Sequence, residues 1–211
     1  MSLKEPEKPK RKSNFSRRGF LQGVGVASGV LTTGVLENEA EAQSSAAVVG
    51  PGEVPITLQI NGKPYKVNVE PRMTLCDTLR HRLELTAAKR VCDRATCGAC
   101  TVIIDGKTMY SCTVLAIDAQ GRQIQTLEGL TQNGKPHPVS RAFVANDAQQ
   151  CGYCTPGLVV AAKGLLDHNP NPTEDEVKAG LGGNLCRCGT YMGVRKAVLD
   201  AAKEMRGGKN A

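Results

Sequence analysis

Two short segments of the chain alternate apolar with polar positions. Residues 56–60 and 65–69 each place every second side chain on an apolar face, which is typical of strands with one buried side. Between them, Asn61-Gly62 is a favoured sequence for a tight turn that joins antiparallel strands. The pattern therefore predicts a β-hairpin at residues 56–69.

The segment after the hairpin predicts one helix and three more strands. Thr74 can cap a helix, and leucines recur at helical spacing after it. Short runs at residues 101–104, 108–112 and 123–127 have the character of strands. One helix laid across five short strands is the plan of a β-grasp domain, which we expect over residues 55–130.

Beyond Gly129 the apolar pattern takes a helical period. Thr173 and Glu176 have the spacing of a capping box, and a proline can start each of the two helices before them. The four predicted helices cover residues 138–146, residues 156–168, a segment from Thr173 onward, and residues 191–205. We therefore predict an α+β chain in which the β-grasp domain is followed by a four-helix domain at residues 131–208.

Eight of the nine cysteines fall into two groups of four. The first group is Cys92, Cys97, Cys100 and Cys112, with four, two and eleven residues between successive members. This spacing matches the plant-type ferredoxin pattern, in which a short loop supplies three thiolates and a more distant segment supplies the fourth. It predicts a 2Fe-2S centre held by these four residues.

The second group is Cys151, Cys154, Cys186 and Cys188, and its spacing is less specific because such pairs also hold zinc. Thr155 and Pro156 look like the N-cap and first residue of a helix. Cys154 and its cluster would then lie at the positive end of a helix dipole, which favours the more negative, reduced state. We expect this second 2Fe-2S centre to accept electrons more readily than a plant-type ferredoxin.

Structural zinc, disulfide bonds and plain burial are the alternative roles for these cysteines. Zinc favours paired ligands on both sides of a site, whereas Cys112 has no near partner in the sequence. Cys76 is the ninth cysteine and lies beside Leu75 in the predicted helix. We expect it to pack as a small apolar residue, not to bind metal.

Three segments resemble the iron-sulfur subunit of the molybdenum hydroxylases, the family of xanthine dehydrogenase and aldehyde oxidoreductase. They are CGACTV from Cys97, QCGYCTPG from Gln150 and GNLCRC from Gly183. The similarity runs from about Pro55 to about Met205 and includes every predicted ligand. The order Gly-Thr-Tyr at residues 189–191, where many members have Thr-Gly-Tyr, resembles the exported, periplasmic aldehyde oxidoreductase type.

The resemblance implies a ferredoxin-like 2Fe-2S domain, a helical 2Fe-2S domain and a large partner subunit that carries molybdopterin. It places the cluster of the helical domain next to the molybdenum, and the plant-type cluster towards FAD on a further subunit or another acceptor. Gln150 matches the position that contacts the pterin, although a glutamine there can also satisfy loop backbone. Substrate would react on the large subunit, so no catalytic acid or base is expected in this chain.

One departure from the family lies between the first two ligands. Residues 93–96 read Asp-Arg-Ala-Thr, where many relatives are rich in glycine. Any backbone position in this loop that needs a positive φ must therefore be relieved elsewhere or be less strained. We expect cluster binding to survive the change.

The beginning of the chain predicts export. A basic stretch, the segment SRRGFLQ at residues 16–22, a glycine-rich apolar run and Ala40-Glu-Ala42 follow the plan of a twin-arginine signal peptide. We expect a signal at residues 1–42, a linker at residues 43–54 and a periplasmic protein. The apolar run is shorter than the roughly 20 residues of a membrane span, so no permanent anchor is expected.

Composition narrows the classes of molecule that the chain could bind. The chain has no tryptophan and 3% aromatic residues, which argues against a surface that stacks nucleic-acid bases. The formal net charge is +7. It comes close to zero when the predicted signal is removed and the negative charges of eight thiolates are added to the positive charges of the two oxidised cluster cores. The family resemblance and the export signal, not the composition, imply an electron-transfer subunit of an exported molybdenum-dependent oxidoreductase that acts on an aldehyde or a heterocycle. An independent periplasmic ferredoxin, a redox-sensing module and a zinc-stabilised binding module remain the alternatives.

Overall fold

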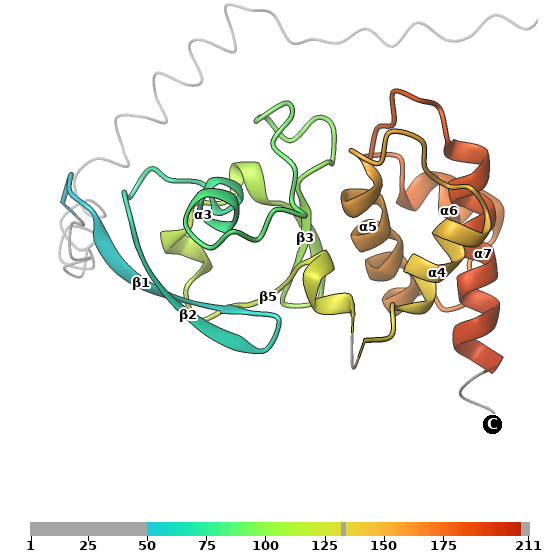
Figure 1. The fold of residues 1–211 in the computed structure, drawn as a ribbon, viewed down its shortest axis with the longest axis horizontal. Helices are drawn as coiled ribbons and strands as arrows, with labels where there is room; N and C mark the ends of the chain where they lie inside the picture. The colour runs from blue at the N-terminus through green and yellow to red at the C-terminus, as the bar shows by residue number, and fades with distance from the viewer. Residues whose placement is uncertain (1–49, 132–133, 208–211) are drawn as a thin grey trace, which may run out of the picture. The chain divides into compact units, whose positions relative to one another are not determined.

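The structure is a computed structural model that describes residues 50–131 and 134–207 (Figure 1). The predicted signal at residues 1–42, and the part of the predicted linker up to residue 49, lie outside the described residues. In the described part of the chain, no helix combines the length and the apolar character that a membrane crossing needs.

A five-stranded mixed sheet forms the first half of the described chain, in the order β2-β1-β5-β3-β4. The predicted hairpin is confirmed as antiparallel strands β1 and β2 with Ile60 opposite Lys63. Strand β5 pairs parallel with β1 and antiparallel with β3, and β3 pairs antiparallel with β4. The strands are β1 (Val54–Ile60), β2 (Lys63–Val69), β3 (Thr101–Ile104), β4 (Lys107–Tyr110) and β5 (Gln123–Gln125).

Helix α3 (Leu75–His81) packs on this sheet, as the leucine spacing predicts. The Thr74 hydroxyl accepts a hydrogen bond from the backbone N–H of Asp77 at 3.1 Å, which is the expected N-cap. Leu75 and Leu79 are fully buried in one core with apolar residues of β1 and β3. The hydrophobic face of the helix therefore closes one side of the sheet.

The predicted strand at residues 108–112 is wrong at its end. Strand β4 stops at Tyr110, and the 3-10 turn η1 (Ser111–Thr113) carries Cys112. The chain turns because the Ser111 side chain donates to the carbonyl oxygen of Cys100 at 2.8 Å, and its backbone N–H donates to the same oxygen. These two hydrogen bonds to one carbonyl bring Cys112 beside Cys100.

The second half of the described chain is helical, and the four predicted helices are confirmed. The predicted capping box is present, since Thr173 and Glu176 each bond the backbone N–H of the other. The helices α4 and α7 pack side by side, and Phe143, Leu158, Val177 and Val198 are buried in their common core. The helices are α4 (Pro138–Ala145), α5 (Thr155–His168), α6 (Glu174–Gly180) and α7 (Tyr191–Gly207).

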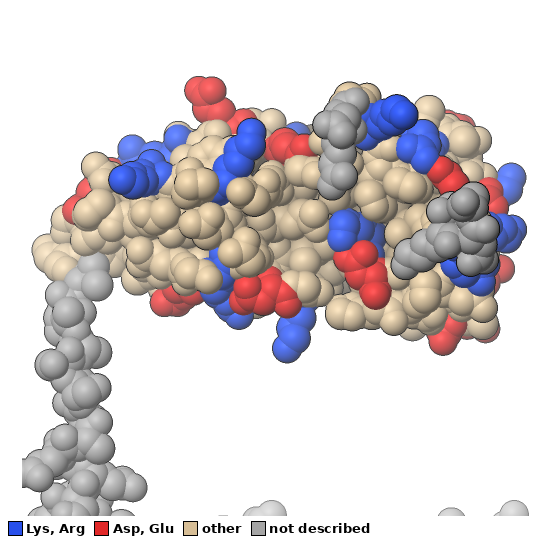
Figure 2. All heavy atoms as spheres, turned by 90° about the horizontal axis from the view of Figure 1, so that it is seen from below, with Lys and Arg blue, Asp and Glu red and all other residues tan. Residues whose placement is uncertain are grey.

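The surface carries charges of both signs. On the face shown in Figure 2, Lys and Arg side chains are interspersed with Asp and Glu. The described part of the chain has exposed ion pairs, such as Arg122 with Asp105 and Lys178 with Asp175.

Candidate metal centres

The four cysteines of the first group come together as two contacting pairs. The side chain of Cys92 lies within hydrogen-bonding range of Cys97, and that of Cys100 lies within range of Cys112. Cys100 and Cys112 are buried, whereas Cys92 and Cys97 are half-buried. One pair therefore faces the core beneath α3, and the other lies closer to the solvent.

Backbone N–H groups of the loop point at these sulfur atoms. The N–H of Ala95 donates to Cys112 Sγ and the N–H of Thr96 donates to Cys92 Sγ, both at 3.4 Å. The backbone N–H of Arg94 is the main cause that lowers the pKa of Cys92 to about 7. Such donors stabilise the thiolate form, which is the form that binds metal.

The loop between the first two predicted ligands adopts left-handed backbone conformations although it lacks glycine. Asp93 and Ala95 both have a positive φ, at 52° and 54°. A side chain with a Cβ is disfavoured in this left-handed region, at a cost of roughly 1–2 kcal/mol. The loop nevertheless keeps the conformation, and this conformation aims the N–H groups of Ala95 and Thr96 at the sulfur atoms.

Replacing Ala95 with glycine should stabilise the protein. The change removes the left-handed strain and adds only the backbone entropy of glycine, so the free energy of unfolding should rise by about 0.5–1 kcal/mol. Thermal unfolding of the metal-loaded protein measures the effect. The control is Ala87→Gly, at a half-buried loop residue outside the positive-φ set, which should destabilise. Equal shifts in the two variants would contradict the role assigned to strain.

The second group also divides into a buried and an exposed part. Cys186 is buried and its side chain contacts Cys154, which is half-buried. Cys151 and Cys188 are exposed. A cofactor held by these four cysteines would therefore have one side in the protein interior and the other side at the surface.

Helix α5 begins one residue earlier than predicted. Cys154 itself is the N-cap, with helical φ and ψ of −80° and −16°, and Pro156 follows in the first turn. Burial raises the pKa of the Cys154 thiol to about 12. The predicted position at a helix start is confirmed, and burial opposes the stabilising effect of the helix dipole on the charged thiolate.

Cys186 behaves differently from Cys154. Burial opposes ionisation here too, but the Thr190 hydroxyl and the backbone N–H groups of Thr190 and Cys188 outweigh it and lower the pKa of Cys186 to about 7. The Cys186 sulfur lies 3.2 Å from Thr190 Oγ1, just before α7 begins. Hydrogen-bond donors at this sulfur therefore favour its metal-binding form.

The chemistry of each cysteine group fits a 2Fe-2S cluster. Among residues 50–131 and 134–207, no three His, Cys, Asp or Glu side chains are already gathered around one point. A 2Fe-2S cluster is held by four cysteine thiolates, two for each iron, and each group supplies four free cysteines. The donor set of each group therefore fits such a cluster, which the contacting cysteines would hold.

The two cysteine groups are joined by direct hydrogen bonds, which we call the loop-to-loop contact (residues 97–101 with residues 183–185). The N–H of Leu185 donates to the carbonyl oxygen of Cys97 at 2.9 Å. The buried amide of Asn184 donates to the Gly98 carbonyl at 2.8 Å and to the Thr101 hydroxyl at 3.0 Å. Cys97, a predicted ligand of the first group, is thus hydrogen-bonded to the residue before Cys186, a predicted ligand of the second group.

Glycines allow the two loops to approach this closely. A Cβ on Gly157, in the first turn of α5, would lie 2.5 Å from the Gly98 carbonyl oxygen. A Cβ on Gly98 would lie 2.6 Å from the Gly183 oxygen, and the φ of Gly98 is +70°. The Tyr110 hydroxyl donates to that same Gly183 oxygen at 3.1 Å. Only residues without a Cβ fit at Gly98 and Gly157 unless the backbone shifts.

Sequence reasoning missed the residues of this contact. Asn184 is 6% exposed, and Tyr110 is the last residue of strand β4. Neither residue belongs to a local sequence pattern that predicts a long-range hydrogen bond. The segment Gly183-Asn-Leu-Cys186 was visible as part of the family resemblance, without roles for its first three residues.

The sequence also predicted roles for Gln150 and Cys76, and the two residues lie in different environments. Gln150 is exposed and immediately precedes Cys151. Its predicted contact with a pterin remains a prediction. Cys76 is 1% exposed and packs against Cys100 and Cys112, and burial raises its pKa to about 11. The ninth cysteine is therefore a buried neighbour of the first group, as a small core residue would be.

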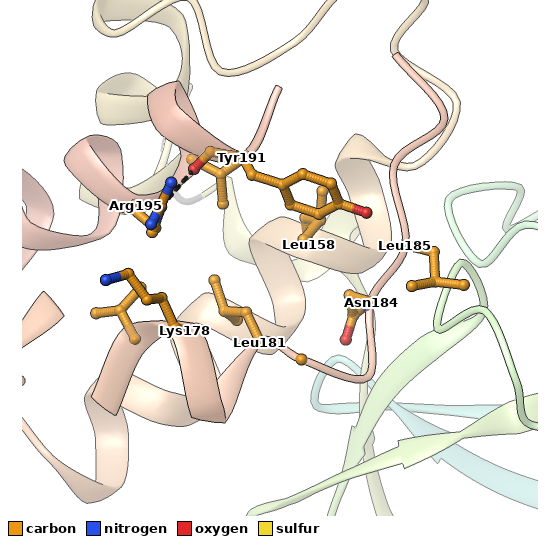
Figure 3. Close-up of a pocket in the computed structure, with 10 residues that line it drawn as sticks. Leu158, Lys178, Leu181, Asn184, Leu185, Tyr191 and Arg195 are labelled. Carbon is orange, nitrogen blue, oxygen red and sulfur yellow. Dashed lines mark hydrogen bonds between the residues drawn. The ribbon is translucent and has the colours of Figure 1, made fainter. Parts of the chain in front are cut away.

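A pocket of about 320 Å³ adjoins the second group (Figure 3). Its Tyr191 hydroxyl accepts the backbone N–H of Cys186 at 2.7 Å, and the Tyr191 carbonyl oxygen accepts from Arg195. The pocket is lined by Leu158, Val177, Lys178, Leu181, Gly182, Asn184, Leu185, Tyr191, Val194 and Arg195. Its wall thus includes the residue that fixes the backbone of a predicted ligand.

Taken together, the fold and the paired thiols define a carrier of two 2Fe-2S clusters. Residues 57–155 match the family described as 2Fe-2S iron-sulfur cluster binding domain. Residues 126–199 match the family described as 2Fe-2S binding domain. Both matches agree with the two predicted centres.

Known proteins identify the family more closely. The chain is 43% identical to the nicotinate dehydrogenase small FeS subunit of Eubacterium barkeri over 151 residues, which is 72% of this chain and 96% of that protein. It is 39% identical over 176 residues to the aldehyde oxidoreductase iron-sulfur-binding subunit PaoA of Escherichia coli, covering 76% and 77% of the two chains. A chain of quinoline 2-oxidoreductase from Pseudomonas putida 86 superposes with a TM-score of 0.71 at 43% identity, over 74% of this chain and 98% of that chain. The protein belongs to the family of iron-sulfur small subunits of the molybdenum hydroxylases.

Proposed function

We propose that this chain relays electrons from a molybdopterin-containing large subunit, through its second and then its first cluster, to FAD on another subunit or to another acceptor. When bound, each 2Fe-2S cluster takes up and releases one electron at a time. The chain's own residues hold the two clusters, orient them and set their potentials. No residue of the chain is assigned a catalytic role towards substrate.

The loop-to-loop contact is the observation that carries this proposal. Leu185 precedes Cys186 directly, and its N–H bonds the carbonyl oxygen of Cys97. The path from Cys97 Sγ to Cys186 Sγ therefore contains a single hydrogen bond, and the rest of it consists of covalent bonds of Cys97, Leu185 and Cys186. Two independent ferredoxin modules would have no need of such a connection, so the contact favours a relay.

The exposed edge of the second group supports the proposed order of transfer. Cys151 and Cys188 are exposed, and large apolar side chains surround them in the sequence. Tyr153, Leu185 and Met192 are 50%, 51% and 71% exposed. Exposed apolar groups next to a cofactor are typical of a surface that another subunit covers. We propose that the large subunit binds here, with Gln150 at the pterin.

The relatives and the twin-arginine pattern support our proposals for the substrate class and the location. The relatives named above act on nicotinate, aldehydes or quinoline according to their names. We therefore propose an aldehyde or a nitrogen heterocycle as the substrate of the assembled enzyme. The twin-arginine pattern at residues 16–22 supports export of the folded, cluster-loaded chain to the periplasm.

One purification tests the proposal. The full-length chain is isolated from its native host with the subunits that accompany it, and iron, labile sulfide and molybdenum are measured together with electron paramagnetic resonance of the reduced sample. Two distinct 2Fe-2S spectra and a molybdenum-containing subunit in the periplasmic fraction are expected. Two clusters without molybdenum would favour an independent ferredoxin, and a colourless protein containing zinc would overturn the assignment.

A further inference from the structure

The Thr190 hydroxyl makes an unusual contact for a residue at a helix start. Residues before a helix commonly cap its free N–H groups with their side-chain oxygen. Thr190 precedes α7, but its Oγ1 lies 3.2 Å from the sulfur of Cys186. No other hydrogen bond of this side chain occurs within the described residues. The hydroxyl is thus committed to the sulfur.

The direction of this hydrogen bond follows from metal binding. A thiolate that binds iron carries no proton, so it can only accept. Thr190 Oγ1 must then be the donor to Cys186 Sγ. The backbone N–H of Cys186 is already bonded to the Tyr191 hydroxyl at 2.7 Å, which points towards this segment in Figure 3. Tyr191 therefore holds the backbone while Thr190 donates to the sulfur.

The sulfur of Cys186 is buried, and Cys186 follows directly on the loop-to-loop contact. Cys186 is 7% exposed, whereas Cys151 and Cys188 are exposed to solvent. Leu185, its immediate neighbour, makes the hydrogen bond to Cys97. A hydrogen bond at a buried atom is weakly screened by water, so its effect on a charge there is larger than at the exposed ligands.

We propose that Thr190 is a positioning residue that raises the reduction potential of the second cluster through its hydrogen bond to Cys186 Sγ. This inference rests on the proposed function, in which the molybdenum-containing subunit supplies the electron that reduces the second cluster. Reduction adds one negative charge to the site, and a hydrogen bond to a more negative sulfur is stronger. Thr190 keeps its proton, and no covalent bond forms or breaks.

The test compares the hydroxyl-free variant Thr190→Val with Thr190→Ser, which keeps the hydroxyl. Both are made in the full chain and purified in the complex, and each cluster's potential is measured by a redox titration followed by electron paramagnetic resonance. At a fixed potential, the ratio of reduced to oxidised second cluster should fall about fivefold to tenfold in Thr190→Val. At 59 mV per tenfold this is a downward shift of about 40–60 mV. Thr190→Ser should stay close to the wild type.

The first cluster is the internal control, because its ligands lie outside this contact and its potential should not change in either variant. An unchanged second potential in Thr190→Val, with its spectrum intact, would overturn the inference and leave the relay standing. Equal shifts in Val and Ser would also overturn it. If valine prevents cluster assembly, Thr190→Ala replaces it, and loss of the cluster in both would show that Thr190 is only structural. Absence of clusters from the wild type would instead reject the proposed function.

Discussion

Replacing Cys112 with alanine in a Cys76→Ala background is expected to halve the iron and labile sulfide of the purified chain. Cys112 is one of four thiolates predicted for the first cluster, and its sulfur lies beside Cys100 in a buried site. Alanine offers no ligand, and the Cys76→Ala background removes the one neighbouring thiol that packs against this pair. Metal analysis should therefore find one cluster, with the spectrum of the second cluster unchanged.

The background variant is the matched control. Cys76 is 1% exposed and packs with Cys100 and Cys112, yet we assign it no ligand role. Cys76→Ala alone should keep both clusters and lose only the packing of one sulfur atom, at a cost of about 1 kcal/mol. Full iron content in the double variant, or loss of the first cluster in Cys76→Ala, would contradict the assignment of these cysteines.

Gly157→Ala is expected to destabilise the protein by about 1–3 kcal/mol, because the added Cβ overpacks a close backbone contact. That Cβ would lie 2.5 Å from the Gly98 oxygen and 3.1 Å from the Ala99 backbone, and backbone atoms cannot move aside as a flexible side chain can. The variant should also weaken the magnetic interaction between the two reduced clusters, since α5 must move away from the first loop. Thermal unfolding and electron paramagnetic resonance measure the two effects.

Gly207→Ala is the control for the Gly157 variant. Gly207 also lies in a helix, but a Cβ there meets nothing within 4 Å. Alanine is the better helix former, so stability should stay the same or rise slightly. If Gly157→Ala behaved in the same way, with an unchanged interaction between clusters, the close approach of the two loops would not be a constraint.

Local rules predicted most of the fold. The alternation around Asn61-Gly62 produced the hairpin, Thr74 caps α3, and the spacing of Thr173 and Glu176 produced the capping box of α6. Each of these depends on residues within a few positions of one another, which a single sequence displays directly. The cysteine spacing likewise indicated the first metal centre, because the loop that supplies three of its four thiolates is a local structure. The second centre was inferred instead from the helix start after Cys154 and from the family resemblance.

The features that sequence reasoning missed depend on distant parts of the chain. The bond from Asn184 to Gly98 joins residues 86 positions apart, and no local pattern indicates it. Strand β4 ends early because Ser111 bonds the carbonyl of Cys100, which is again a tertiary contact. The strained backbone at Ala95 is maintained by donors to sulfur. The intrinsic backbone preference of alanine favours a negative φ at this position. The hydrogen bonds to the cysteine sulfur atoms outweigh that preference here.

The bond between Leu185 and Cys97 also bears on how the holoprotein matures. When either ligand loop becomes ordered, the donor or the acceptor of this hydrogen bond takes its final position. The conformational entropy lost when one site is filled is therefore not lost again when the other is filled. Insertion of one 2Fe-2S cluster in either domain should thus favour insertion of the other. Molecules that hold a single cluster should be scarce during biogenesis.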